Sequence, residues 1–152
     1  MASKAASVAE FEHPPVVEVA VGIEFVPIAN WGVPYFGLFW ERIREQYPTF
    51  QVAPPLASQI EQFATGLTNS KVSLQLINQS DVRCWFKWAD GSRILQLQDN
   101  RLILNWRKMT SDAIYPKYEK LKPELECTWK GFKQFLQEMK LSVPDIVQCE
   151  FT

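Results

Sequence analysis

Few side chains in this sequence could catalyse a reaction. His13 is the only histidine, and Pro14 and Pro15 follow it directly. A nucleophilic Ser–His or Cys–His device would have to use His13, and nothing in the pattern supplies its partners. The sequence has no glycine-rich phosphate loop, nucleophile elbow, metal-binding histidine pair or closely spaced cysteine pair. We therefore predict a non-catalytic protein with no metal and no cofactor, and His13 in a loop.

Two carboxylates, Glu18 and Glu24, share one face of an expected strand. General acid–base chemistry needs such groups close together or buried. At the usual rise per residue of a strand, they would lie about 20 Å apart. The sequence instead predicts that they pair with the cations Lys87, Arg101 or Arg107.

The three cysteines, Cys84, Cys127 and Cys149, are an odd number at wide spacing. This favours free thiols in a reducing cytoplasm over a disulfide framework, with Cys84 facing the core. A secretory signal pattern is not evident, and the apolar runs are too short to cross a bilayer. We therefore predict a cytoplasmic protein with no membrane partner.

Residues 83–107 predict a three-stranded antiparallel meander divided at Asp90-Gly91 and Asp99-Asn100. Both pairs tolerate the positive φ that two-residue hairpins of the primed types require. The resulting register sets Phe86 opposite Leu95, Cys84 opposite Leu97, Leu97 opposite Leu102, and Leu95 opposite Leu104.

Side chains alternate between the faces of a strand, so this register sorts the meander into two sets. The apolar set, expected in the core, is Cys84, Phe86, Trp88, Leu95, Leu97, Leu102, Leu104 and Trp106. Arg93 is the exception on that face, where we expect a cation–π contact between Trp88 and Trp106. The other face is expected to be wet.

The remaining pattern surrounds this meander with further strands and two amphipathic helices. Apolar spacing and proline positions predict a strand over 16–26, a helix from Pro34 to Pro48, a short edge strand over 50–52, a short helix over 58–64, a strand over 72–77, a helical segment over 115–140 kinked or broken near Pro123, and a last strand over 146–152. The fold class is therefore α+β: a two-layer sandwich with a mainly antiparallel sheet and two main helices packed on one face. Residues 1–10 are predicted to form a flexible tail, and 11–152 a single domain.

Several of these stretches together resemble an uncharacterised protein family that occurs sporadically in bacteria and archaea. They are PPVVEV, the Tyr47-Pro48 helix end, FKWADGSRILQLQDNRLILNWRK, YPKYE and the CE of the last strand. The family has no established activity, so the resemblance implies no catalytic residues. It implies an association with defence or mobile genes, and it implies that this chain is the N-terminal half of a longer architecture.

The wet face of the meander is the predicted interaction surface. An exposed tryptophan among arginines and amides has the composition of a protein interface, formed by Trp85, Lys87, Ile94, Gln96, Arg101, Ile103, Asn105 and Arg107. We predict a protein partner or a homo-oligomer, bound by this face or by the edge strand over 146–151. Two alternatives remain: a merely solvated face, and single-stranded nucleic acid, against which the single aromatic residue and the net charge of −1 argue.

A second functional class is a pocket for a small apolar ligand between the helices and the sheet. The residues that could line it are Trp31, Tyr35, Phe39, Trp40, Trp129 and Phe132. The alternative for these aromatic side chains is that they fill a close-packed core.

Overall fold

The computed structural model describes residues 14–57 and 82–152 of the chain. His13, the predicted tail over 1–10, the short helix over 58–64 and the strand over 72–77 lie outside the described residues.

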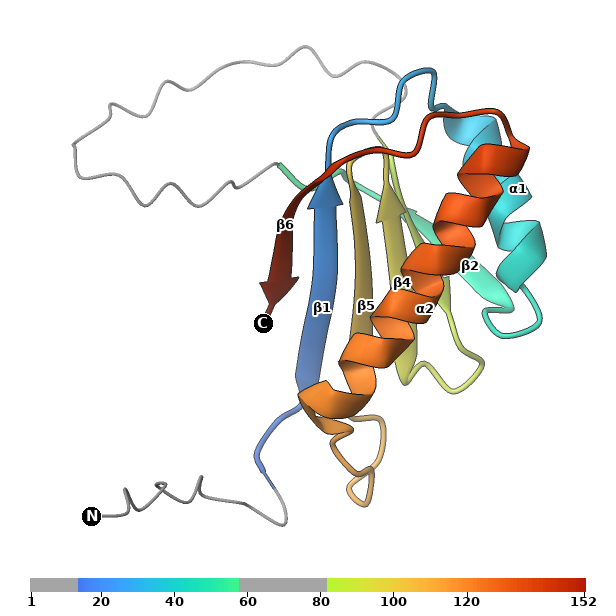
Figure 1. Ribbon diagram of the computed structural model, residues 1–152. Coiled ribbons are helices and arrows are strands. Elements are labelled where there is room, and N and C mark those ends of the chain that lie inside the picture. Colours follow the sequence, from blue (N-terminus) through green and yellow to red (C-terminus); the bar gives the residue numbers. More distant parts are fainter. Residues whose placement is uncertain (1–13, 58–81) are drawn as a thin grey trace, which may run out of the picture.

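Six strands form one sheet, with two helices beside it (Figure 1). In chain order the elements are β1 (Glu18–Phe25), α1 (Val33–Ile43), β2 (Thr49–Ala53), β3 (Arg83–Lys87), β4 (Arg93–Gln98), β5 (Arg101–Arg107), α2 (Lys117–Glu138) and β6 (Ile146–Phe151). The strand order across the sheet is β2-β3-β4-β5-β1-β6, and every neighbouring pair is antiparallel. The predicted α+β arrangement, with the helices on one face, is confirmed.

The register of the meander is confirmed pair by pair. Phe86 lies opposite Leu95 and Cys84 opposite Leu97, while Leu97 and Leu95 lie opposite Leu102 and Leu104 on β5. All of these side chains are buried. The hydrophobic alternation fixes this register, because a slip by one residue would turn every leucine away from the core.

Neither turn has the predicted conformation. In the first, Gly91 N–H donates to the Trp88 carbonyl at 3.0 Å, so Ala89 and Asp90 are its central residues. Gly91 follows with φ of +73°, and the Asp90 carboxylate accepts a bond from the Ser92 N–H at 2.9 Å. The loop is therefore longer than a two-residue turn, although the register is unchanged.

The second turn does contain two residues, Asp99 and Asn100, but neither is among the residues with positive φ. The carbonyl of Asp99 accepts a bond from Ile28 N–H at 3.0 Å, and that of Asn100 accepts one from Phe25 N–H at 2.9 Å. These bonds to β1 and the loop after it hold a turn that the two residues alone would not favour.

Helix α1 begins after Gly32, with Pro34 in its first turn, where a missing N–H leaves no bond unmade. It ends at Ile43, earlier than the predicted end at Pro48. The Tyr47 N–H still donates to the Ile43 carbonyl at 2.8 Å, which brings the Tyr47 ring back into the core.

Helix α2 runs without interruption through Pro123, so of the two predicted alternatives, a kink or a break, the break is wrong. Pro123 lies on the exposed side of the helix. Water can reach the carbonyl that the proline leaves without a donor, so the helix continues despite the lost bond. The apolar side of α2 faces the sheet and includes the fully buried residues Leu121, Phe132, Phe135 and Leu136.

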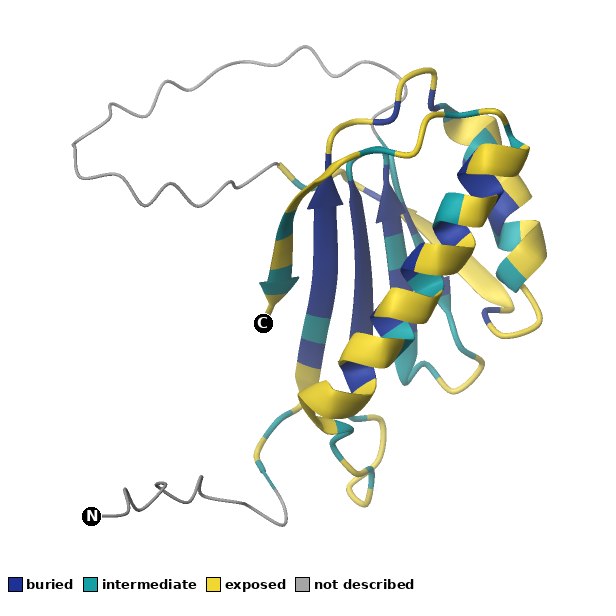
Figure 2. Cartoon of the chain, viewed as in Figure 1, coloured by how far each residue is buried: buried dark blue, intermediate teal, exposed yellow. Residues whose placement is uncertain are grey.

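The core lies between the sheet and the two helices (Figure 2). The ring of Phe132 on α2 lies 5.2 Å from that of Phe39 on α1 and 6.1 Å from that of Phe25 on β1. These contacts join both helices to the middle of the sheet. The outer strand β6 is mostly exposed or half-buried.

Candidate interaction surfaces

The predicted interaction residues all lie on the sheet face opposite the helices. The register aligns Trp85, Gln96 and Ile103 in one row across three strands, and Lys87, Ile94 and Asn105 in the next. The pattern therefore placed them together correctly.

The expectation that this face is wet is wrong. Ile94, Arg101, Ile103 and Asn105 are buried; Trp85, Lys87 and Gln96 are half-buried; and Arg107 is exposed. The exposed fraction of Ile94 is 3%. Alternation shows which side of the sheet a residue occupies, but it does not show how its neighbours cover it.

Hydrogen bonds between side chains run across this face from strand to strand. Gln96 Nε2 donates to Asn105 Oδ1 at 2.7 Å, and Asn105 Nδ2 donates to Glu18 Oε1 at 3.0 Å. Arg83 Nη1 donates to Gln96 Oε1 at 3.0 Å. These groups satisfy one another, whereas Arg83 Nε, Trp85 Nε1 and Arg101 Nε on the same face are buried without a hydrogen-bond partner among the described residues.

The predicted pairing of the two β1 carboxylates with arginines is confirmed. Arg101 donates to Glu24 Oε2 at 2.7 Å in a buried pair, and Arg101 also lies 3.5 Å from Glu150 of β6. Glu18 lies 3.5 Å from Arg107, in a pair of which both side chains are nearly half exposed. Glu24 and Glu150 therefore share one arginine, so the three carboxylates on the β1 and β6 side exceed their two arginines by one negative charge.

The β3 side of the same face is basic. The charged groups of Arg83 and Lys87 lie 5.3 and 5.4 Å from the centre of the Trp85 ring. Lys87 Nζ reaches over β2 to Gln51 Oε1 at 2.7 Å. Within the described residues, the ion pairs give neither cation a carboxylate partner.

The predicted cation–π contact of Arg93 is present on Trp88, 5.3 Å from the ring centre. The main partner of Arg93 is Glu124 of α2, which accepts a bond from Nε at 3.0 Å. The arginine therefore ties the end of the sheet to α2 as well as contacting an indole.

The aromatic residues proposed to line a ligand cavity pack mostly against one another. Trp31, Phe39, Trp129 and Phe132 are buried in the core, and Tyr35 and Trp40 are half-buried against it. The Trp31 ring is 5.1 Å from Phe36 and 5.9 Å from Phe132. Of the six, Trp40 lines a cavity, and that cavity lies at the edge of the sheet.

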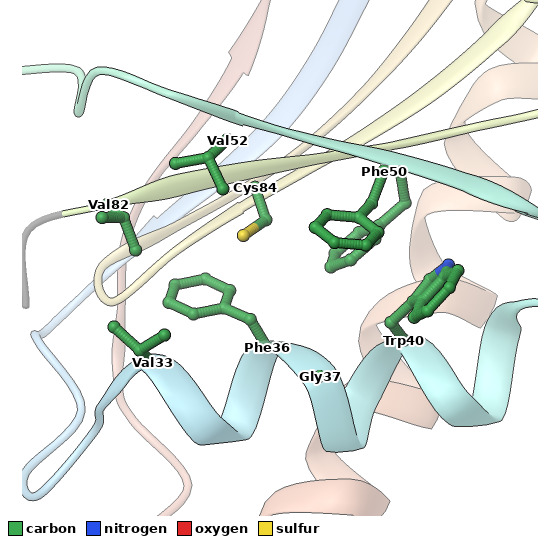
Figure 3. A pocket seen from close by; sticks show the side chains of 9 residues that line it. Val33, Phe36, Gly37, Trp40, Phe50, Val52, Val82 and Cys84 are labelled. Atoms are coloured by element: carbon green, nitrogen blue, oxygen red, sulfur yellow. The ribbon is translucent and has the colours of Figure 1, made fainter.

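This cavity is a half-open apolar groove of about 240 Å³ between α1 and the β2 edge (Figure 3). Side chains from α1, β2 and β3 point into it from both sides. We call it the β2 groove; its lining is Val33, Phe36, Gly37, Trp40, Phe50, Val52, Val82, Cys84 and Phe86. At Gly37, a Cβ would meet no atom within 4 Å, so the missing side chain helps to keep the groove open.

Strand β2 is one edge of the sheet, because none of the described strands pairs with its outer side. Successive residues of an antiparallel strand direct their backbone groups alternately to its two sides. The bond from Trp88 N–H to the Arg93 carbonyl, at 3.0 Å, sets this alternation for β3. By the register, Gln51 bonds back to β3, whereas Phe50 and Val52 direct their N–H and C=O groups outward.

Strand β6 is the opposite edge, as predicted. Thr152 and Ala20 exchange two backbone bonds, of 2.8 and 2.9 Å. Alternation then directs the N–H and C=O groups of Cys149 and Phe151 away from β1. On the helix side of this edge Ile146 and Phe151 are about half exposed, with fractions of 49% and 53%.

Sequence reasoning missed the β2 groove. Two features of the sequence are related to it. Phe50 and Val52 alternate with Thr49 and Gln51, and Gly37 is a small residue among the bulky side chains of α1. This alternation predicted the short edge strand over 50–52, which β2 confirms, but neither the alternation nor one glycine shows that a groove lies beside that strand.

Burial raises the pKa of the Cys84 thiol from 9.0 to about 11, whereas Cys127 and Cys149 are exposed; all three thiols are free. The described residues contain no cluster of three metal-ligating side chains. Neither described helix is long and apolar enough to cross a membrane. Comparisons with protein-family models, curated proteins and solved structures found no match.

Proposed function

We propose that this chain is a non-catalytic protein-interaction or scaffold domain that binds by adding a strand to its free β6 edge. The observation that supports this proposal is the β6 edge itself. It combines outward backbone groups at Cys149 and Phe151 with half-exposed apolar side chains on the helix side. An unpaired edge with these properties is a template for another strand.

The edge is a better binding surface than the polar sheet face. The predicted face residues bond to one another, and most are shielded from water. A partner on that face would have to break these bonds before forming its own. A strand at β6 satisfies backbone groups that have no other strand beside them in the described part of the chain.

Cys149→Pro tests the proposal, because it removes an outward N–H and leaves the bonds to β1 in place. We expect the unmodified chain to associate as its concentration rises in sedimentation velocity. The amides of Cys149 and Phe151 should become protected from hydrogen exchange over the same range. Cys149→Pro should remain monomeric, while Cys149→Val should associate normally.

A chain that stays monomeric at all concentrations would overturn this proposal. So would a Cys149→Pro variant that associates as strongly as the unmodified chain. Circular dichroism and urea unfolding of both variants show whether the fold is intact.

A second candidate function, binding of a small apolar ligand, is favoured by the apolar lining of the β2 groove. Its volume of about 240 Å³ is below the roughly 300–1,000 Å³ typical of ligand pockets. Native mass spectrometry of the purified chain would detect a retained molecule. A mass that disappears in Gly37→Trp would support this function.

A further inference from the structure

We infer that the β2 groove receives β6 of a second copy, so that molecules associate head to tail into one continuous sheet. This inference rests on the proposed role of β6 and names its partner. It is carried by three matches between the two edges of the sheet: strand direction, side-chain pattern and charge.

The two edges have the strand directions that this arrangement requires. All neighbours in the six-stranded sheet are antiparallel, so β2 and β6 run in opposite directions. A second copy shifted sideways across the sheet therefore presents β6 antiparallel to β2, with its helices on the same face. The strands have similar lengths, five residues in β2 and six in β6.

The side-chain patterns of the two edges also match. On the helix side, β2 offers Phe50 and Val52, which are 53% and 57% exposed, and β6 offers Cys149 and Phe151. On the other side, Gln51 faces the same way as Glu150. Pairing the strands would extend the apolar layer beside the β2 groove and leave polar groups on the polar side.

Charge distinguishes this arrangement from symmetric pairing of like edges. Glu150 lies on the polar side of β6, and Arg83 and Lys87 lie one strand inside β2. Lys87 already extends over β2 to Gln51, so an acidic group on an added strand is within its reach. Pairing of β6 with β6 would bring the Glu150 carboxylates of the two copies together, and pairing of β2 with β2 would bring their basic groups together. In both cases like charges would repel one another.

Two variants with complementary defects test the inference. Gly37→Trp fills the β2 groove and leaves β6 intact, because a side chain at Gly37 points into open space. Cys149→Pro blocks β6 and leaves the groove intact. In sedimentation velocity we expect each variant alone to be monomeric, and an equimolar mixture to form a one-to-one dimer and nothing larger. The unmodified chain should form species beyond the dimer, because a head-to-tail contact leaves one edge free at each end.

Gly131→Trp is the matched control, since Gly131 is also an exposed helical glycine whose Cβ would meet no atom within 4 Å. It should associate as the unmodified chain does, whereas Gly37→Trp should weaken association at least tenfold. Urea unfolding should show all three variants folded.

Several outcomes would overturn the inference. If Gly37→Trp associates normally while Cys149→Pro does not, β6 pairs elsewhere and the proposed function stands without this partner. If Cys149→Pro associates normally, the proposed function itself fails. A small molecule retained in the groove would give it a different occupant. Protection of the Phe50 and Val52 amides that does not depend on protein concentration would also overturn the inference. It would indicate that the occupant is the chain's own stretch 72–77, where Val, Leu and Leu alternate with polar residues.

Discussion

Glu18 and Glu24 lie on the same face of β1, but water reaches only one of them. The side chain of Glu24 is 3% exposed in its pair with Arg101, and that of Glu18 is 45% exposed in its pair with Arg107. Removing one member of a buried pair leaves a charge without compensation, whereas an exposed pair contributes little. The same chemical change at the two positions should therefore have very different costs.

We expect Glu24→Gln to lower the free energy of unfolding by about 3 kcal/mol, and Glu18→Gln by less than about 1 kcal/mol. Urea denaturation at neutral pH measures both. Equal costs at the two positions would contradict the burial difference between them.

The buried Cys84 thiol predicts a pH dependence of stability. Its pKa is about 11 in the folded protein and 9.0 is the ordinary value. Between these values the unfolded chain loses the thiol proton and the folded chain keeps it, so stability falls as pH rises from about 9 to about 11. Below pH 9 this contribution is fully present.

Comparing the unmodified chain with Cys84→Val isolates the effect, because the other titrating groups cancel in the difference. From pH 8 to pH 10.5, we expect the unmodified chain to lose on the order of 2 kcal/mol more stability than Cys84→Val. Urea unfolding at both pH values provides the measurement. Parallel losses in the two proteins would show that the thiol ionises as freely in the fold as outside it.

At the scale of elements, each helix contains a glycine with open space beside it, Gly37 in α1 and Gly131 in α2. Glycine costs a helix interior roughly 0.5–1 kcal/mol relative to alanine. Gly131→Ala should therefore raise the free energy of unfolding by that amount, as measured by urea denaturation. A destabilised Gly131→Ala variant would show that the position is more crowded than the structure has it.

The elements that sequence patterns predicted best are those with a long apolar alternation or stripe. The meander, β1 and α2 each bury one whole face, so their period reveals both their type and their orientation. At two places the local sequence preference did not decide the structure. Pro123 does not break α2, because it lies on the side of the helix that water reaches. The Asp99-Asn100 turn lacks positive φ, because N–H groups of β1 and of the loop after it bond to its carbonyls. The β2 groove depends on which α1 positions lie beside which strand, and no periodicity in the sequence contains that information.

At the scale of the whole molecule, the polar face has its acidic groups toward β6, and toward β2 it has two cations, Arg83 and Lys87, for which residues 14–57 and 82–152 supply no carboxylate partner. If copies join edge to edge, association should weaken with salt. Raising NaCl from about 0.05 M to about 0.5 M shortens the screening length from about 14 Å to about 4 Å. We expect the association constant to fall about threefold to tenfold, in line with one or two exposed ion pairs.

Glu150→Gln should remove most of that salt dependence, with sedimentation velocity as the measurement. Glu126→Gln is its control, because it changes the net charge equally on an exposed part of α2. Identical salt dependence in the two variants would show that Glu150 does not face the cations of a second copy.

The place of β1 between β5 and β6 has a consequence for synthesis on the ribosome. Glu24 of β1 bonds to Arg101, 77 residues later, and to Gln148, 124 residues later. At about 5–20 residues per second, β1 waits roughly 4–15 seconds for its first neighbour in the sheet. During that time its valines and isoleucine have no strand on either side, so the nascent chain is most vulnerable to wrong pairing before β5 emerges.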